Sequence, residues 1–178
     1  MIFPLSQIQC FPPIESPGST VLILGSMPGR ASLQAGQYYA HPRNAFWPIM
    51  GELLGAAPSL PYEARIKLLQ SAGIALWDVL ASCVRDGSLD ASIVESTVSA
   101  NDFKAFFLSH PAITDVFFNG ATAEKYFQKY VRHLLEPPNA LRFERLPSSS
   151  PAHASKTYQQ KLTAWQAALA LVIVPPNC

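Results

Sequence analysis

Short apolar runs alternate with helical patterns along this chain, and this alternation constrains the fold more than any other feature of the sequence. The apolar runs are bounded by Gly, Pro or polar residues and predict strands buried on both faces, at residues 20–24, 74–77, 113–118 and 141–146. Helical patterns are found at residues 46–54, 62–71, 101–109, 121–135 and 155–171. Strands that alternate with helices in this way favour an α/β fold. We expect a three-layer α/β/α sandwich around a central, mostly parallel four-stranded sheet.

The composition fits one globular domain that spans residues 1–178. Hydrophobic residues make up 49% of the 178 positions and charged residues 14%, whereas about a quarter of a soluble domain is usually charged. This balance argues against a disordered chain, a coiled coil or a highly charged protein. No internal repeat, low-complexity tract or interdomain linker is visible in the sequence.

The cysteines and the two ends of the chain argue against several classes of protein. Cys10, Cys83 and Cys178 are far apart and form no CxxC pair, so we expect structural thiols rather than a metal site. The first ten residues lack the basic and unbroken apolar regions of a signal peptide, which favours a cytoplasmic protein. The apolar run 167–174 is far shorter than the roughly 20 residues that cross a bilayer. We therefore expect a buried helix end there and no membrane association.

A ligand site is expected in the loops that follow the four predicted strands, because open α/β sheets bind ligands beyond the carboxyl ends of their strands. These loops comprise residues 25–45, 78–92, 119–120 and 147–154. In the first loop Gly25 and Gly29 flank Pro28, and backbone amides there can approach a ligand closely. The loop matches neither GxxxxGK[ST] nor GxGxxG, so nucleoside triphosphate and dinucleotide binding have little support.

The same loop continues into a dense group of aromatic and hydrogen-bonding side chains, which suits a flat heterocycle. The group consists of Tyr38, Tyr39, His41, Arg43, Asn44, Phe46 and Trp47. We expect Phe46 and Trp47 to begin a helix and to face the core. Tyr39 and Asn44 lie in the loop itself, and a functional role is expected for both.

The loop after the fourth strand, LPSSSPAHA, holds three consecutive serines between two prolines and precedes the last predicted helix. Small hydroxyls and exposed amides at a helix N-terminus suit a phosphate group. The alternative is a serine-rich helix cap, which would explain Ser155 alone. The net charge of +1 hides an asymmetry, because residues 120–161 carry +4 and the remainder −3. This segment predicts a local basic face, and ordinary solvated helix surfaces are the alternative.

Three motifs resemble those of the uracil-DNA glycosylase superfamily: GSMPG at residues 25–29, YAHPRNAFW at residues 39–47 and LPS at residues 146–148. The first two are most similar to the mismatch-specific branch. More narrowly, the Met in GSMPG together with SSSPAH at residues 148–153 resembles the hypoxanthine-DNA glycosylase family, whose members excise the base of deoxyinosine. The resemblance implies a uracil-DNA glycosylase-like fold and a monofunctional glycosylase of base-excision repair. Its substrate would be a deaminated base in DNA, hypoxanthine in the first place, with uracil as the alternative.

The resemblance also implies which residues act. Most of the superfamily has Asp, Asn or Glu at the position of Met27, where that side chain positions the attacking water. Because a thioether does this poorly, Asn44 is the predicted catalytic residue. Tyr39 falls where an aromatic residue stacks on the extruded base. The predicted base-binding residues are Gly25, Ser26, Met27, Tyr39, Asp78 and Asn119.

Asp78 and Asn119 are assigned from the chemistry of the base. Hypoxanthine presents an N1–H donor beside an O6 acceptor, so a carboxylate at Asp78 and an amide at Asn119 could read that edge. Uracil-specific relatives have a base-reading Asn at the position of Asp78. Capping of the following loop is the alternative role for Asp78.

The serine loop is predicted to hold DNA, by contacts with the phosphates beside the flipped nucleotide, while residues 151–153 fill the gap in the duplex. The predicted DNA-binding residues are Ser148, Ser149, Ser150, Ala152 and His153. Damaged DNA is the expected partner of a monomeric enzyme that needs no metal and no organic cofactor. Two other classes of protein remain open. A catalytically silent nucleic-acid-binding module is one, because Met27 and Leu146 replace familiar catalytic groups, and a hydrolase of free nucleosides is the other.

Overall fold

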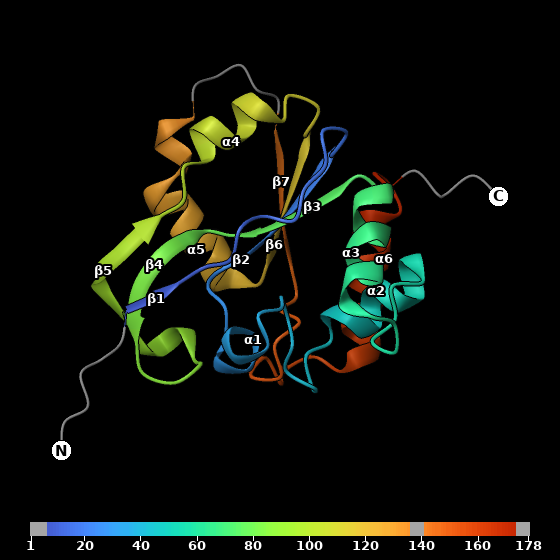
Figure 1. Ribbon diagram of the computed structural model, residues 1–178, viewed down its shortest axis with the longest axis horizontal. Helices are drawn as coiled ribbons and strands as arrows, with labels where there is room; N and C mark the ends of the chain where they lie inside the picture. The colour runs from blue at the N-terminus through green and yellow to red at the C-terminus, as the bar shows by residue number, and fades with distance from the viewer. Residues whose placement is uncertain (1–6, 136–140, 174–178) are drawn as a thin grey trace.

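The computed structural model describes residues 7–135 and 141–173, and at its centre lies a four-stranded parallel sheet in the order β3-β2-β6-β7 (Figure 1). Its strands are β2 (Val21–Gly25), β3 (Ile74–Asp78), β6 (Asp115–Asn119) and β7 (Arg142–Leu146). The four predicted strands and their parallel pairing are confirmed. The register aligns Gly25 with Asp78 and Asn119 with Leu146, so the last residues of neighbouring strands meet at one edge of the sheet.

Helices cover both faces of this sheet. On one side, as Figure 1 shows, lie α2 (Phe46–Leu54), α3 (Tyr62–Ser71) and α6 (Tyr158–Leu169), and on the other lie α4 (Phe103–Ser109) and α5 (Ala121–Tyr130). The side chains of β2 alternate between the two cores: Val21 and Ile23 pack into the first, Leu22 and Leu24 into the second. All four are fully buried, which explains why this strand is continuously apolar. The predicted three-layer α/β/α sandwich is confirmed.

A second, antiparallel sheet was not predicted. It consists of β1 (Gln7–Gln9), β4 (Leu80–Arg85) and β5 (Ile93–Ala100), in the order β1-β4-β5. The interpretation of residues 78–92 as one loop is therefore wrong. The register of β4 against β5 shifts twice, and much of β5 is exposed. Half-buried, irregular strands of this kind do not produce the apolar run that marks a strand buried on both faces.

The ends of several helices differ from the predicted bounds because local capping decides them. Thr157 caps α6 through a reciprocal capping box with Gln160, so the helix begins at Tyr158 and Ser155 is not the cap. Asp102 caps α4 by accepting a hydrogen bond from the Ala105 amide at 3.0 Å. The predicted helix 121–135 divides into α5 and a short 3-10 turn, Arg132–Leu134.

The apolar run near the C-terminus ends α6 as expected, but only in part. Ala168 and Leu169 are buried, whereas Leu171, which follows the end of the helix, is 77% exposed. Cys178, residue 174 and residues 1–6 lie outside the described residues. Within the described ranges Cys10 and Cys83 are free thiols, and no helix is long and apolar enough to cross a membrane.

Candidate active site

A cavity of about 700 Å³ opens at the edge of the sheet where the parallel strands end. Loops from the β2, β3, β6 and β7 ends surround it, together with the short helix α1 (Arg30–Ala35). Every residue that the sequence predicted for the site lines this one cavity: Gly25, Ser26, Met27, Tyr39, Asn44, Asp78, Asn119, Ser148, Ser149, Ser150, Ala152 and His153. The topological rule therefore brings together residues from four distant segments.

The floor of the cavity is formed by Gly25, Tyr39 and Asp78. A Cβ atom at Gly25 would lie 2.5 Å from Asp78 Oδ1 and 2.9 Å from the Tyr39 hydroxyl, so only glycine fits there. Asp78 is 3% exposed, and its Oδ2 is buried without a hydrogen-bond partner in the described part of the chain. The same holds for the Tyr39 hydroxyl. Four buried side-chain polar atoms lack a hydrogen-bond partner among the described residues, and two of them, Asp78 Oδ2 and the Tyr39 hydroxyl, meet in this cavity. The other two are Arg65 Nε and Arg85 Nη1.

The electrostatics of the floor favour neutral groups. Burial, and to a lesser extent the charge of Asp90, raises the pKa of Asp78 from 3.8 to about 7, while Arg85 acts in the opposite direction. Burial also raises the pKa of the Tyr39 phenol well above its usual range. Near neutral pH the Asp78 carboxyl is therefore divided between its protonated and ionised forms.

Tyr39 has the backbone conformation of a strained residue. Its φ of 54° is the one positive value among the non-glycine residues described. The ring packs against Phe46 with centroids 4.3 Å apart, which fixes its orientation beside the cavity. Phe46 and Trp47 are buried in the core at the start of α2, as predicted.

Asn44 lies at the turn that leads into α2. Its side chain lines the cavity and also takes part in the turn. Its Oδ1 accepts a hydrogen bond from the Phe46 amide at 2.9 Å and so forms an Asx turn before the helix. Its backbone amide donates to the His41 carbonyl at 2.9 Å. An amide oxygen has two lone pairs, so Asn44 Oδ1 retains the capacity to accept a second hydrogen bond from a water molecule.

Asn119 and Ser149 bind each other reciprocally. Asn119 Nδ2 donates to Ser149 Oγ, and the Ser149 amide donates to Asn119 Oδ1, both at 2.8 Å. The Ser149 carbonyl also accepts from the Ala45 amide at 2.9 Å, which ties the serine loop to the turn before α2. Ser149 is 1% exposed, so its side chain is a buried tie between three loops. The second hydrogen of Asn119 Nδ2 is not used in this pair, and a side-chain interaction of Asn119 with the Tyr39 phenol acts to lower the pKa of Tyr39.

The other members of the serine loop lie nearer the surface. Ser148 Oγ accepts from the Ser150 amide and Ser150 Oγ from the Ala152 amide, both at 3.2 Å, which leaves the two hydroxyls free to donate. Lys161 of α6 is buried and donates to the Ser150 carbonyl at 3.1 Å. Ala152 is exposed and His153 half-buried at the rim. These hydrogen bonds, within the loop and from Lys161, fix the conformation of the serine loop.

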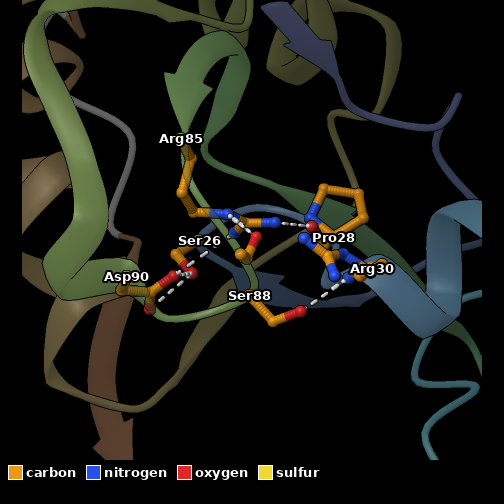
Figure 2. Close-up of polar contacts among 7 residues, drawn as sticks. Ser26, Pro28, Arg30, Arg85, Ser88 and Asp90 are labelled. Carbon is orange, nitrogen blue, oxygen red and sulfur yellow. Dashed lines mark hydrogen bonds and ion pairs between the residues drawn. The ribbon is translucent and has the colours of Figure 1, made fainter. Parts of the chain in front are cut away.

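The connection between β4 and β5 also lines the cavity, through residues 88–91. Segment 78–92 was expected to border the ligand site, but none of its residues beyond Asp78 was named as a site residue. Figure 2 shows the polar contacts of this connection. The Ser26 hydroxyl donates to the Asp90 carboxylate, with distances of 2.9 and 2.8 Å to its two oxygens. Buried Arg85 donates to the carbonyls of Pro28 and Gly87, and its Nη1 lies 3.9 Å from Asp90 Oδ1. In the same region the Arg30 amide donates to Ser88 Oγ at 3.0 Å. These contacts fasten the GSMPG loop to the second sheet.

No sequence motif marks Arg85, Ser88 or Asp90, because their role depends on a tertiary contact between the two sheets. Residues 93–99 read IVESTVS, so apolar and polar residues do not alternate there and no period-2 pattern marks the strand behind them.

The predicted basic face does not surround the cavity. None of the seven basic residues of segment 120–161, all of which the structure describes, lines it. Ion pairs join Lys129 with Glu95, Arg142 with Asp115 and Arg145 with Glu124. The basic side chains that do line the cavity are Arg30 at the start of α1, His41 and Arg43 in the loop before α2, and His153 in the serine loop.

Within residues 7–135 and 141–173 no group of three or more His, Cys, Asp or Glu side chains could hold a metal ion. The cavity instead offers hydrogen-bond donors and acceptors, among them the carboxyl groups of Asp78 and Asp90, together with basic side chains. Such a site suits a flat polar ring carried on an anionic backbone.

Comparison with known proteins gives three findings. Residues 12–170 match the family model of the uracil DNA glycosylase superfamily. Proteins named hypoxanthine DNA glycosylase from Methanosarcina barkeri and Methanosarcina acetivorans are 36% and 35% identical over 66% and 65% of this chain, and over 74% and 73% of their own lengths. A solution NMR structure of a proposed uracil DNA glycosylase from Methanosarcina acetivorans has a TM-score of 0.74 at 30% identity. That match covers 92% of this chain and 97% of the other.

Proposed function

This chain belongs to the uracil DNA glycosylase superfamily, and on that premise we propose that it is a DNA repair enzyme that removes hypoxanthine from DNA. It hydrolyses the N-glycosidic bond between deoxyribose and the deaminated base. The observation that carries the proposal is the cavity floor, where Asp78 Oδ2 and the Tyr39 hydroxyl are buried without partners. A base extruded from the duplex would supply both partners.

The reaction passes through an oxocarbenium-like sugar while negative charge grows on the leaving base. Donors aimed at the base therefore matter more than a strong nucleophile. In this scheme Asn44 is the catalytic residue and orients the attacking water through its Oδ1. The backbone amides of Ser26 and Met27 and the remaining Nδ2 hydrogen of Asn119 face the base. Buried Met27 supports the floor by packing, since its thioether is a weak hydrogen-bond acceptor.

The rim of the cavity is the proposed DNA contact. The hydroxyls of Ser148 and Ser150 donate to phosphates that flank the extruded nucleotide, and the tip with Ala152 and His153 enters the gap in the duplex. The buried Ser149 acts in this proposal by holding the loop in place. We also propose that the enzyme is a single domain and works on damaged DNA as a monomer in the cytoplasm.

A labelled duplex with one deoxyinosine tests the function. Protein is added in excess, and alkali then breaks the strand wherever a base has been lost. Strand breaks that depend on alkali support the glycosylase, whereas intact strands with bound protein would favour a silent DNA-binding module. A matched uracil duplex decides the preferred base. Free inosine, incubated without DNA, tests the remaining alternative of a nucleoside hydrolase.

A further inference from the structure

We propose that Asp78 carries a proton when the enzyme acts, and that its neutral carboxyl pairs with the lactam edge of the extruded base. The pairing uses two hydrogen bonds, with the carboxyl O–H donating to the keto oxygen of the base and the carboxyl C=O accepting from the neighbouring N–H. This inference rests on the proposed function. It adds the protonation state in which Asp78 recognises the extruded base.

The geometry of Asp78 supports this pairing. The residue ends β3 and lies at the cavity floor, with a side chain that is almost fully enclosed. One oxygen approaches Gly25 so closely that a Cβ would stand 2.5 Å away, and the other has no partner among the described residues. An ionised carboxylate in such a place would lack compensation for the loss of its hydration. A neutral carboxyl needs one donor and one acceptor, and a lactam provides both.

The groups around Asp78 favour the protonated form of its carboxyl. The titratable side chains that interact with it are Asp90 beyond β4, Arg85 on β4, Tyr38 and Tyr39 in the loop after α1, and Cys10 beside β3. Asp90 is a second negative charge, while Tyr38, Tyr39 and Cys10 are neutral groups whose own pKa is raised by burial. The positive charge of Arg85 opposes protonation of Asp78. Its Nη1 lies 3.9 Å from Asp90 Oδ1, so this charge is shared with Asp90. The basic groups Arg30, His41, Arg43 and His153 line the same cavity.

The proton on Asp78 also has a role in the reaction, because it stabilises the leaving base. When the bond from C1′ of the sugar to the base nitrogen breaks, its electron pair stays on the base. The oxygen of a water molecule bonds to C1′, and the proton that this water loses is taken up by the base anion, which leaves as the neutral base. Before that proton arrives, negative charge accumulates on the keto oxygen. A carboxyl that donates a hydrogen bond stabilises this charge, whereas an ionised carboxylate would repel it. Asp78 keeps its proton throughout, so no further reactant is required.

The test compares single-turnover rates of base release between about pH 6 and about pH 8.5. The wild-type rate should fall about tenfold per pH unit once Asp78 ionises. Asp78→Asn has a permanent donor and acceptor, so it should stay within about tenfold of the wild type at low pH and should lack the fall. Asp78→Leu removes both groups and should lose at least about a hundredfold. Asp86→Asn makes the same chemical change at an exposed position beyond β4 and should keep the wild-type profile.

Two results would overturn the proposal: a wild-type rate that rises with pH through this range, or a folded Asp78→Asn protein that is as inactive as Asp78→Leu. A second measurement, an NMR titration, does not require the enzyme to be active. Asp78 is assigned as the carboxyl whose NMR titration disappears in Asp78→Asn, and free hypoxanthine should shift that titration to higher pH. If no base is released at any pH but this shift is seen, the proposed function fails and the pairing stands. A titration that moves to lower pH, or not at all, contradicts the pairing.

Discussion

A buried carboxyl without a partner destabilises a folded protein, and Asp78 is such a group. Its pKa is about 7 in the folded state, compared with 3.8 for an exposed carboxyl. The folded protein therefore binds more protons than the unfolded chain between these two values, so stability falls as pH rises through that window. A residue that costs stability at the floor of a cavity is typical of a functional position.

Asp78→Asn should remove this pH-dependent cost, because an amide does not titrate. We expect its free energy of unfolding, minus that of the wild type, to increase by roughly 2 to 4 kcal/mol between about pH 4 and about pH 8. Urea denaturation of both proteins at several pH values measures the difference. A constant difference across this range would show that Asp78 titrates normally in the folded protein.

Asn44 combines a structural and a proposed catalytic role, and a substitution must separate the two. Asn44→Ala should lower single-turnover base release by about a hundredfold or more, because no group then orients the water. It should also cost about 1 kcal/mol of stability, since the Phe46 amide loses its acceptor. Quench-flow kinetics and chemical denaturation measure the two effects.

The matched control is Asp102→Ala, which removes a helix cap on the exposed N-terminus of α4. It should cost a similar amount of stability and leave base release unchanged. If both variants lose activity equally, or if Asn44→Ala keeps the wild-type rate, Asn44 does not act in catalysis.

At the scale of elements, prediction succeeded where burial is complete and failed where it is partial. The strand β2 is enclosed by neighbours on both edges and both faces, so its sequence is apolar throughout and its position is evident. Strands β4 and β5 have buried and exposed residues in an irregular order, with two shifts of register. Their pairing is decided by tertiary contacts, which a single sequence does not display.

The same distinction applies to the site. Gly25, Asp78 and Asn119 could be predicted because parallel strands end at a common edge, and motifs in the loops marked Tyr39 and Asn44. The contact of Asp90 with Ser26 joins residues 64 positions apart across two sheets, and no local pattern encodes it. Burial of Ser149 within a run of three serines was equally invisible in the sequence.

The two hydrogen bonds between Asn119 and Ser149 connect the end of β6 to the serine loop, so we expect their loss to affect stability and activity. Ser149→Ala should cost about 1 to 3 kcal/mol, because a partly buried Asn119 N–H loses its acceptor. Base release should fall as well, since the serine loop and the turn before α2 meet at Ser149. Ser99→Ala, at an exposed serine of β5, is the control and should change stability by less than about 0.5 kcal/mol. Equal stability of the two variants would contradict a stabilising role of the Asn119–Ser149 hydrogen bonds.

For the whole molecule, the distribution of charge decides how DNA is bound. Three of the seven Lys or Arg residues in segment 120–161 are engaged in ion pairs, and none of the seven lines the cavity, so few phosphates should be contacted. We expect the logarithm of the DNA association constant to fall with the logarithm of salt concentration at a slope of roughly −2 to −4. Fluorescence anisotropy over a salt series measures it.

Two variants locate the phosphate contacts. Arg43→Gln at the cavity mouth should reduce the magnitude of the slope by about one, whereas Lys129→Gln, which breaks the ion pair with Glu95, should leave it unchanged. A steep wild-type slope that Lys129→Gln reduces would instead place DNA on the basic segment.

The central claim is that the enzyme releases an intact base from DNA, and direct detection of that base tests it. A duplex with one deoxyinosine is incubated with excess protein, and the small molecules are separated and identified by mass spectrometry before any alkali is added. We predict free hypoxanthine equal in amount to the abasic sites, on a strand that is still continuous. Nicked strands without free hypoxanthine, or an untouched duplex to which the protein remains bound, would contradict the account.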